Sequence, residues 1–279
     1  MTLRTFGCSI TQGFALPDVV KPVLDSQGRP MTSLADVDVD WSDIHLYQPS
    51  EYAWPAVLAR SLGLDVVNYA RRGSCFQQIA RQCVVNVRDI KPEDTVIVMW
   101  TYLSRLSLQW PARTAVPFCN IAHPDWGWRT VMLGFNKLFG VSKSTASSPD
   151  EDQLIQDYVE ATAKNQLDPR GVYNRYYNNL VLQQTVSGLL ENTGARVIHL
   201  SVETQPVLRQ LEFARSDLEA SLRDPYTIPD PETWYTLDVD YDSAYTILDP
   251  SIPPAENDMH PSETHHRNFA EVIKARYFD

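Results

Sequence analysis

Short apolar runs alternate with longer amphipathic stretches along the chain. Four runs have the length of strands, at residues 3–6, 65–68, 94–100 and 196–201. The run DTVIVMW at 94–100 is almost unbroken, which is typical of a strand buried on both faces of a sheet. Apolar residues recur at helical spacing over residues 50–62, 74–88, 151–165, 172–193, 205–223 and 262–276. Strands separated by helices predict an α/β fold with a parallel sheet and right-handed crossovers.

The same pattern predicts where some helices begin and which side chains face inward. Ser50 and Glu51 form a capping signal before the first long helix, and Gly63 ends that helix. Inward positions are expected at Ile79, Val84 and Val87 of 74–88 and at Tyr173, Tyr176, Tyr177, Leu180 and Val181 of 172–193.

Two stretches interrupt the alternation. Residues 14–50 are rich in Pro, Asp and Ser and are expected to form a long loop. Residues 107–150 contain Trp110, Trp126 and Trp128 and then a Ser-rich linker near 142–149. We interpret 107–150 as an insertion or lid, whose tryptophans either line a pocket or anchor it to the core. The chain is therefore expected to be one domain, residues 1–279, with an insertion between the third and fourth strands.

Composition and charge narrow the classes of partner. The 279 residues are 43% hydrophobic and 21% charged, which is typical of a packed domain, and the net charge of -11 disfavours nucleic acid. No apolar run approaches the 18 residues that suggest a membrane span, and the N-terminus lacks a signal-peptide pattern. The four cysteines contain no CxxC pair. We expect a cytoplasmic protein with reduced thiols; the pattern leaves its oligomeric state open.

Candidate chemistry lies directly after the strands, because active sites of parallel sheets form at the carboxyl ends of the strands. Ser9 follows the first strand on a tight turn, where its hydroxyl would project into the crevice and its N–H could face an oxyanion. Gly73 follows the second strand, and its N–H can approach a ligand because it has no side chain. Thr101 and Arg105 follow the third strand.

A candidate base lies near the C-terminus, in the segment NDMHPSETHH. Pro261 favours an extended or turn conformation at His260 and keeps that residue out of a helix. A histidine on such a loop can act as a base toward a serine, and Asp258 could orient and stabilise its imidazole.

Three blocks of this sequence resemble the SGNH/GDSL hydrolases. FGCSIT resembles the first block of that family, FGDSIT. VVNYARRGS resembles the second block, in which an N-x-A-x-x-G pattern supplies an oxyanion-hole glycine, and NDMHPSETHH resembles the last, in which D-x-x-H-P holds the acid and base. The blocks occur in the family's order and span nearly the whole chain.

The resemblance implies a flavodoxin-like three-layer α/β/α fold with a parallel sheet. It also implies ester hydrolysis or acyl transfer without a metal or cofactor. Ser9 matches the family's nucleophile, Gly73 its oxyanion glycine and His260 its base. His266 matches a second histidine that is often found in the last helix, and we expect it to be structural.

The chain departs from the family pattern at three positions. Asn257 stands where the family has its acid, so either Asp258 takes that role, which we favour, or the site is a Ser-His dyad. The third strand leads into WTYLSR, which lacks the family's oxyanion Asn; Thr101 could donate a hydrogen bond instead, and Arg105 could stabilise negative charge. Cys8 replaces the Asp before the nucleophile, which a serine activated by its base should tolerate.

Plainer interpretations exist for each residue. Gly73 can simply complete a turn, Thr101 can be an ordinary strand-end residue, and Arg105 can be solvated or paired with a carboxylate. The spacing of His260, His265 and His266 matches no metal-ligand pattern. Two acidic segments, 36–40 and 238–242, resemble the start of a calcium loop but lack its Gly and distal Glu.

The sequence thus predicts an esterase with a Ser9-His260-Asp258 site that acts on a small-molecule or carbohydrate ester, an O-acetyl group on a sugar being one option. Two alternatives stay open: an acyltransferase that uses the same residues, and a non-catalytic binding protein with this fold.

Overall fold

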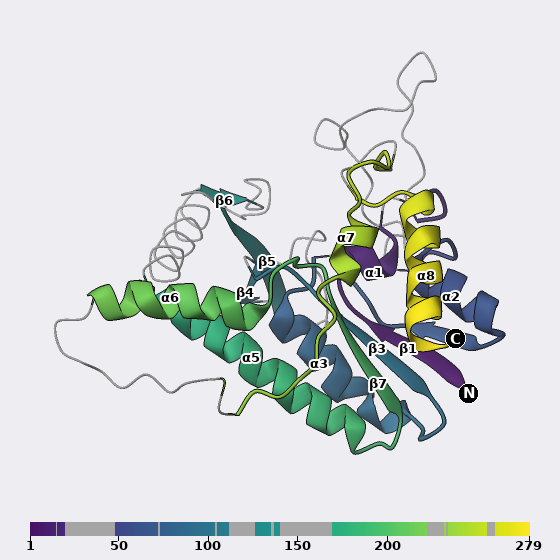
Figure 1. Cartoon of the computed structure of the whole chain (residues 1–279), viewed down its shortest axis with the longest axis horizontal. Coiled ribbons are helices and arrows are strands. Elements are labelled where there is room, and N and C mark those ends of the chain that lie inside the picture. Colours follow the sequence, from purple (N-terminus) through teal and green to yellow (C-terminus); the bar gives the residue numbers. More distant parts are fainter. Residues whose placement is uncertain are drawn as a thin grey trace, which may run out of the picture.

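Four parallel strands form the centre of the fold in a computed structural model of the chain (Figure 1). The structure describes residues 1–14, 16–19, 48–71, 73–103, 105–111, 126–134, 137–139, 169–221, 232, 234–255 and 260–279. The strands are β1 (Thr2–Phe6), β2 (Asp65–Asn68), β3 (Thr95–Trp100) and β7 (Arg196–Ser201), in the order β2-β1-β3-β7. This is the flavodoxin-like order that the resemblance implied.

Helices cover both faces of this sheet. They are α1 (Ser9–Gln12), α2 (Trp54–Leu62), α3 (Phe76–Asn86) with a 3₁₀ turn (Val87–Asp89), α5 (Pro169–Glu191), α6 (Val207–Ser221), α7 (Ser243–Ile247) and α8 (Glu263–Tyr277). In Figure 1, α3 and α5 lie on one face and α2 and α8 on the other, and α6 runs along α5. The expected three-layer α/β/α fold is therefore confirmed.

Strand β3 separates two hydrophobic cores. Its Val96, Val98 and Trp100 pack in the cluster with α3, α5 and α6, whereas Ile97 and Met99 pack in the cluster with α2 and α8. Successive side chains of a strand point to opposite faces, so a strand covered on both faces buries its side chains along its whole length and is largely apolar. All six residues of β3 are accordingly buried.

The chain between β3 and β7 contains a second, antiparallel sheet. Its strands are β4 (Arg105–Pro111), β5 (Trp126–Gly134) and β6 (Lys137–Phe139), which pair in the order β4-β5-β6. Sequence analysis predicted no strands in this insertion. The expected linker at 142–149 and the expected helix at 151–165 lie outside the described residues, as does most of the expected loop at 14–50.

The predicted cap of α2 is wrong. Helix α2 begins at Trp54, with Ala53 as the preceding cap residue and Pro in its first turn. Ser50 instead donates a hydrogen bond from Oγ to the Asp18 carboxylate at 2.6 Å and accepts one from the Tyr52 N–H. Pro55 explains the shift, because proline fits the first turn of a helix, where an N–H has no intrahelical partner.

Two inward assignments are also wrong. Val84 is 53% exposed and Val181 is 38% exposed. On α3 the inward position one turn after Ile79 belongs to Cys83, which is fully buried, and Val84 lies a further 100° around the helix. Ile79, Tyr173 and Leu180 face inward as predicted, whereas Val87, Tyr176 and Tyr177 are partly buried against the core.

A buried ion pair fixes the beginnings of β1 and β3. Arg4 Nε donates to Asp94 Oδ2 at 2.7 Å, and Asp94 also accepts hydrogen bonds from the backbone N–H groups of Thr2 and Lys91. Burial alone would raise the pKa of the Asp94 carboxyl, but these hydrogen bonds outweigh burial and lower its pKa below the ordinary value. Asp94 therefore stays ionised in the folded protein.

We predict that Asp94→Asn lowers the free energy of unfolding by about 3 kcal/mol at pH 7, because it leaves the buried Arg4 without its counter-ion. The loss is measured by urea denaturation. Since the native pKa is depressed, the contribution of the ionised carboxylate is present above about pH 4 and is lost as the pH falls through the native pKa.

The exposed pair of Arg60 and Glu51 provides the control for this variant. Glu51→Gln should change the free energy of unfolding by less than about 1 kcal/mol, because water screens exposed pairs. Equal effects of the two substitutions would show that Asp94 is not a special anchor.

Candidate active site

Ser9 begins α1, directly after the tight turn of Gly7 and Cys8 that follows β1. Only a glycine fits at position 7, because a Cβ there would lie 2.2 Å from Oγ1 of Thr11. Cys8 caps α1, and Ser9 is its first residue, 1% exposed. The N–H groups of Gly13 and Phe14 both donate to the Ser9 carbonyl, so the helix ends after a single turn.

His260 reaches Ser9 from the other end of the chain. Its Nε2 lies 2.9 Å from Ser9 Oγ. Phe14 packs edge-on against the imidazole, with ring centroids 5.2 Å apart. The carbonyl of His260 accepts a hydrogen bond from the Ala255 N–H at 3.0 Å, so His260 is bonded to the chain that precedes it. The structure therefore brings together the two residues that the sequence assigned as nucleophile and base.

The candidate third member of the site, Asp258, lies outside the described residues, as does Asn257. The choice between a triad and a dyad therefore stays as the sequence left it.

The loop that follows β2 is bonded to the loop that carries Ser9. The Arg71 N–H donates to the Gly7 carbonyl at 3.2 Å. Asn68 donates from Nδ2 to the Thr11 carbonyl at 2.8 Å and accepts the Ala70 N–H on Oδ1 at 3.0 Å. Sequence analysis gave Asn68 no role of its own, although it is the first residue of the N-x-A-x-x-G pattern.

Gly73 occupies this second loop with a φ of 75°. This backbone conformation is costly for other residues, so the turn itself requires glycine. A Cβ at this position would meet nothing within 4 Å among the described atoms, so packing does not exclude a side chain. Both interpretations of Gly73, a turn residue or an oxyanion donor, agree with this geometry.

Thr101 and Arg105 contact each other at the end of β3. Arg105 Nη1 donates to Thr101 Oγ1 at 3.0 Å and to the Ser74 carbonyl at 3.3 Å. Thr101 is fully buried, whereas 9% of the surface of Arg105 is exposed. The guanidinium thus joins the end of β3 to the residue that follows Gly73.

Two further side chains at this edge were missed by sequence analysis. The Tyr102 ring lies under the Arg105 guanidinium, 5.2 Å away. Burial raises the pKa of Tyr102 to about 12, with Cys8 and Glu203 adding to the rise and Arg105 opposing it. Glu203 accepts the Leu103 N–H at 2.8 Å, and burial raises the pKa of its carboxyl. Glu203 comes two residues after β7, and inspecting the end of this fourth strand as well would have found it.

Both histidines after His260 have structural partners. His265 accepts the Ser262 N–H on Nδ1 and bonds through Nε2 to the Asp249 carbonyl at 2.9 Å. His266 is fully buried and accepts the Trp54 N–H on Nδ1 at 3.2 Å. Burial lowers the pKa of His266 to about 3, with its histidine neighbours adding to the effect. Among the described side chains, no three His, Cys, Asp or Glu form a group that could hold a metal ion.

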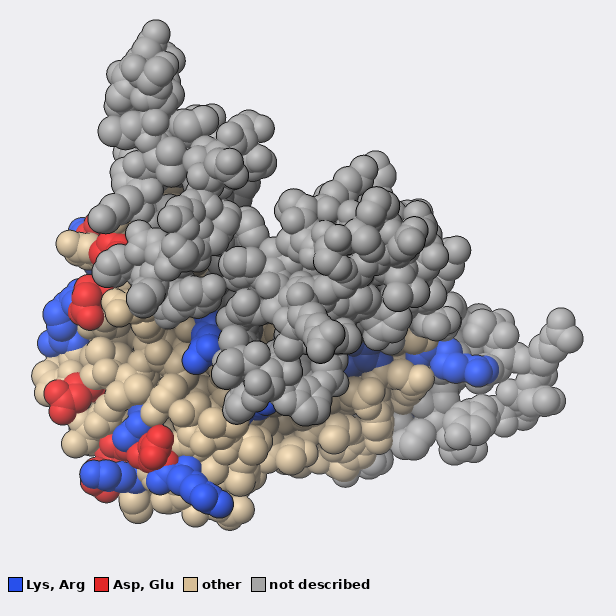
Figure 2. All heavy atoms as spheres, turned by 180° about the vertical axis from the view of Figure 1, so that it is seen from behind, with Lys and Arg blue, Asp and Glu red and all other residues tan. Residues whose placement is uncertain are grey.

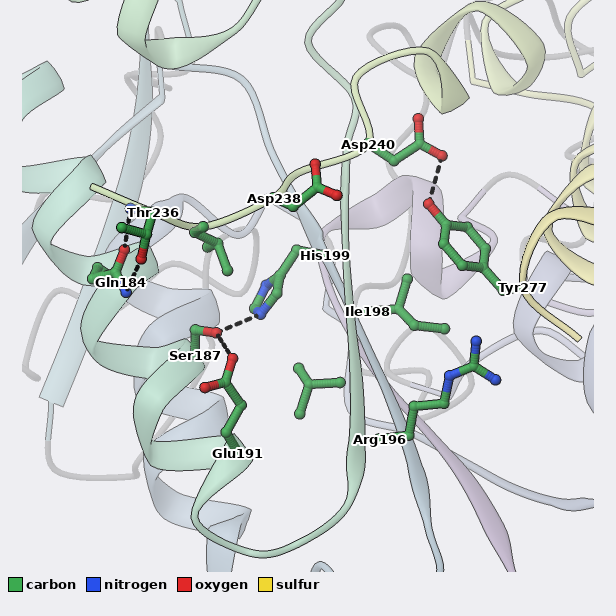
Figure 3. Close-up of a pocket in the computed structure, with 12 residues that line it drawn as sticks. Gln184, Ser187, Glu191, Arg196, Ile198, His199, Thr236, Asp238, Asp240 and Tyr277 are labelled. Carbon is green, nitrogen blue, oxygen red and sulfur yellow. Dashed lines mark hydrogen bonds between the residues drawn. The ribbon is translucent and has the colours of Figure 1, made fainter. Parts of the chain in front are cut away.

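A separate cleft of about 410 Å³ lies at the outer edge of β7, and none of the candidate site residues lines it (Figure 3). At its wall, His199 Nδ1 accepts the Trp100 Nε1–H, so its Nε2 carries a proton and donates to Ser187, which donates to Glu191. Burial lowers the pKa of His199 to about 4. With no lone pair facing Ser187, this imidazole cannot act as its base.

Acidic and basic side chains lie close together at one end of the face shown in Figure 2. The described part of that face shows no continuous basic stripe. Within the described ranges, no helix is long and apolar enough to cross a membrane.

The strand order β2-β1-β3-β7, with helices on both faces of the sheet, is that of a flavodoxin-like α/β/α fold. The three sequence blocks follow β1, follow β2 and precede α8 in this fold.

Comparison with solved structures gives alignments over nearly the whole chain. A protein described as lipolytic and of the G-D-S-L family, from Desulfitobacterium hafniense DCB-2, is 11% identical over 98% of each chain, with a TM-score of 0.43. A member of the lipolytic G-D-S-L family from Veillonella parvula DSM 2008 is 14% identical over 100% of this chain and 98% of its own, with a TM-score of 0.39. An acetyl xylan esterase from the rumen bacterium Butyrivibrio proteoclasticus is 12% identical over 99% of this chain and 64% of its own, with a TM-score of 0.38.

No family model and no curated protein matches the sequence.

We predict that acid destabilises the protein through its buried neutral histidines. The unfolded chain binds protons at His199 and His266 below about pH 6.5, whereas the native pKa values are about 4 and about 3. Stability should therefore fall by about 1.4 kcal/mol per pH unit for each histidine as the pH drops from 6 toward 4.

The measurement is the free energy of unfolding in urea at pH 6, 5 and 4.5. His199→Gln should remove about half of the slope that the two histidines cause, whatever it does to stability at pH 7. A slope unchanged in this variant would rule out the assignment to His199.

Proposed function

We propose that this chain is a serine hydrolase that cleaves carboxylic esters, with Ser9 as nucleophile and His260 as general base. The observation that carries the proposal is the distance of 2.9 Å between His260 Nε2 and Ser9 Oγ. This is the hydrogen-bonding distance at which an imidazole can take the proton of a serine hydroxyl.

The reaction would proceed through an acyl-enzyme. His260 Nε2 takes the Ser9 proton as Oγ attacks the ester carbonyl carbon, and the protonated imidazole then gives this proton to the departing alkoxide. Water next attacks the acyl group with His260 again as base, which releases the acid and restores Ser9. The neutral imidazole must carry its proton on Nδ1 in this scheme, and Asp258 is the proposed partner for that proton; without it the pair works as a dyad.

Backbone N–H groups are the proposed oxyanion donors. Ser9 is the first residue of α1, so its N–H has no intrahelical acceptor. Gly73 is the proposed second donor, since its loop is bonded to the turn before Ser9 through Arg71 and Gly7. Thr101 is less suited to this role, because it is fully buried; its hydroxyl accepts a hydrogen bond from Arg105 and keeps its own proton to donate.

The acceptor of the acyl group separates hydrolysis from acyl transfer. We propose hydrolysis because water, unlike an alcohol acceptor, needs no binding site of its own. The proposed substrate is a small-molecule or carbohydrate ester. A fluorophosphonate probe, which labels an activated serine, distinguishes either enzyme from a binding protein with this fold.

We predict that Ser9→Ala lowers kcat for a short-chain aryl ester by at least about 10³-fold and abolishes fluorophosphonate labelling. The control is Ser61→Ala, because the Ser61 hydroxyl only bonds the Leu58 carbonyl within α2. Peptide mass spectrometry identifies the labelled residue. Hydrolysis that survives Ser9→Ala, or a label on another serine, would refute the assignment.

We predict that Gly73→Ala lowers kcat/KM for the same ester by about 10-fold or more, because it displaces a proposed oxyanion donor. Gly63, which ends α2, is the matched control: it also has a positive φ, 66°, and open space around a Cβ. Both substitutions should cost about 1 kcal/mol of stability. If Gly73→Ala and Gly63→Ala leave kcat/KM equally unchanged, Gly73 serves only the turn.

A further inference from the structure

Arg105 is a cation that follows β3 and is held by neutral groups. Only 9% of its surface is exposed. Its hydrogen bonds run from Nη1 to the Thr101 hydroxyl and the Ser74 carbonyl, and its guanidinium lies over the Tyr102 ring. None of these partners carries a negative charge.

Arg4, which is equally buried, differs from Arg105 in having a carboxylate partner. Its Nε lies 2.7 Å from the Asp94 carboxylate. Among the side chains that the structure describes, no carboxylate forms an ion pair with Arg105. A cation removed from water without a counter-ion is costly, and the ring beneath it compensates only in part. An anion supplied from outside would satisfy it.

The guanidinium retains donors for such an anion. It has five N–H groups in a planar fork, and the bonds to described residues all leave from Nη1. Within the part of the chain that the structure describes, Nε and Nη2 have no hydrogen-bond partner, so they can bind a ligand. Planar donors of this kind bind a carboxylate through two parallel hydrogen bonds.

Arg105 lies at the same edge of the sheet as the proposed nucleophile. Strands β1 and β3 pair side by side in parallel, so Ser9, which follows β1, and Thr101 and Arg105, which follow β3, come from neighbouring strand ends. Arg105 also bonds to Ser74, the neighbour of Gly73. The guanidinium thus joins the end of β3 to the loop that carries Gly73.

We propose that Arg105 binds an anionic group of the substrate, so that the site selects esters that carry a carboxylate near the reacting carbonyl. The inference rests on the proposed esterase function and names its substrate class. Arg105 binds the part of the substrate that does not react, and it sets specificity through KM more than through kcat. Thr101 and Ser74 are positioning residues, because they hold Nη1 and so direct the rest of the fork toward the ligand.

The kinetic test compares two pairs of esters that differ only in charge. One pair carries the charge on the alcohol: para-acetoxybenzoate and para-acetoxybenzamide. The other carries it on the acyl group: the mono-para-nitrophenyl ester of adipic acid, and the ester of the branched alkanoic acid in which an isopropyl group replaces the carboxylate.

We predict that the wild-type protein prefers the anionic member of at least one pair by about 10-fold or more in kcat/KM. Arg105→Gln should abolish this preference mainly through KM, and Arg105→Lys should retain part of it. Arg196→Gln, which removes an exposed cation on β7, should leave the preference intact and so controls for net charge. The proposal is overturned if neither pair shows a preference, if the preference survives Arg105→Gln, or if Arg105→Gln slows both members of a pair equally.

A binding test keeps this inference separate from the proposed chemistry. Calorimetry with the Ser9→Ala variant measures binding of adipate and para-hydroxybenzoate, which need no hydrolysis. Adding Arg105→Gln should weaken binding of at least one of them by about 10-fold or more, with near-ultraviolet circular dichroism confirming the fold. If Ser9 is neither labelled nor needed for hydrolysis but this difference is found, the esterase proposal fails and the anion site stands. Absent binding, or binding that Arg105→Gln leaves unchanged, overturns the anion site.

Discussion

The contact between Ser9 and His260 joins residues 251 positions apart, and the rest of the site depends on it. It exists because the segment at the start of α8 is fixed from several sides. His265 bonds the loop before it, and His266 accepts a hydrogen bond from the Trp54 N–H at the start of α2. The burial that makes α8 part of the core therefore also sets the position of the imidazole, and neither histidine neighbour needs to be charged for this.

The carboxyl edge of the sheet provides the other half of the site. Parallel strands place their following loops at one edge, where the loops after β1 and β2 are bonded together by Arg71 and Asn68. Gly7 allows the sharp turn because any side chain there would collide with Thr11. A short strand and a one-turn helix are weak elements alone, and they hold Ser9 because the neighbouring loop and two apolar clusters surround them.

Charge is used in two different ways in this fold. The Asp94 carboxylate, at the amino end of β3, forms an ion pair with Arg4. Arg105 follows the carboxyl end of β3 and is held by neutral oxygens and an aromatic ring. Removing one member of an enclosed pair is costly because it leaves the other charge unpaired, whereas an enclosed cation with unused donors can bind an anion. The two arginines have similar burial, so their difference lies in the partners that the fold brings to them.

The sequence by itself determined the four strands and the main helices, and it singled out Ser9 and His260, which the structure places in contact, because these follow from local periodicity and from short motifs. It could not place Val84 or Ser50, because Cys83 takes the inward position on α3 and the Ser50 hydroxyl bonds to Asp18 instead of capping α2, and the pattern contains neither contact. Only the tertiary structure decided three other features: the strands of the insertion, the hydrogen bonds of Arg105, and the position of Glu203 and Tyr102 at the carboxyl edge of the sheet. These features depend on contacts between segments that are distant in sequence. The register and hydrogen bonds of such segments become fixed only when the layers of the fold pack together.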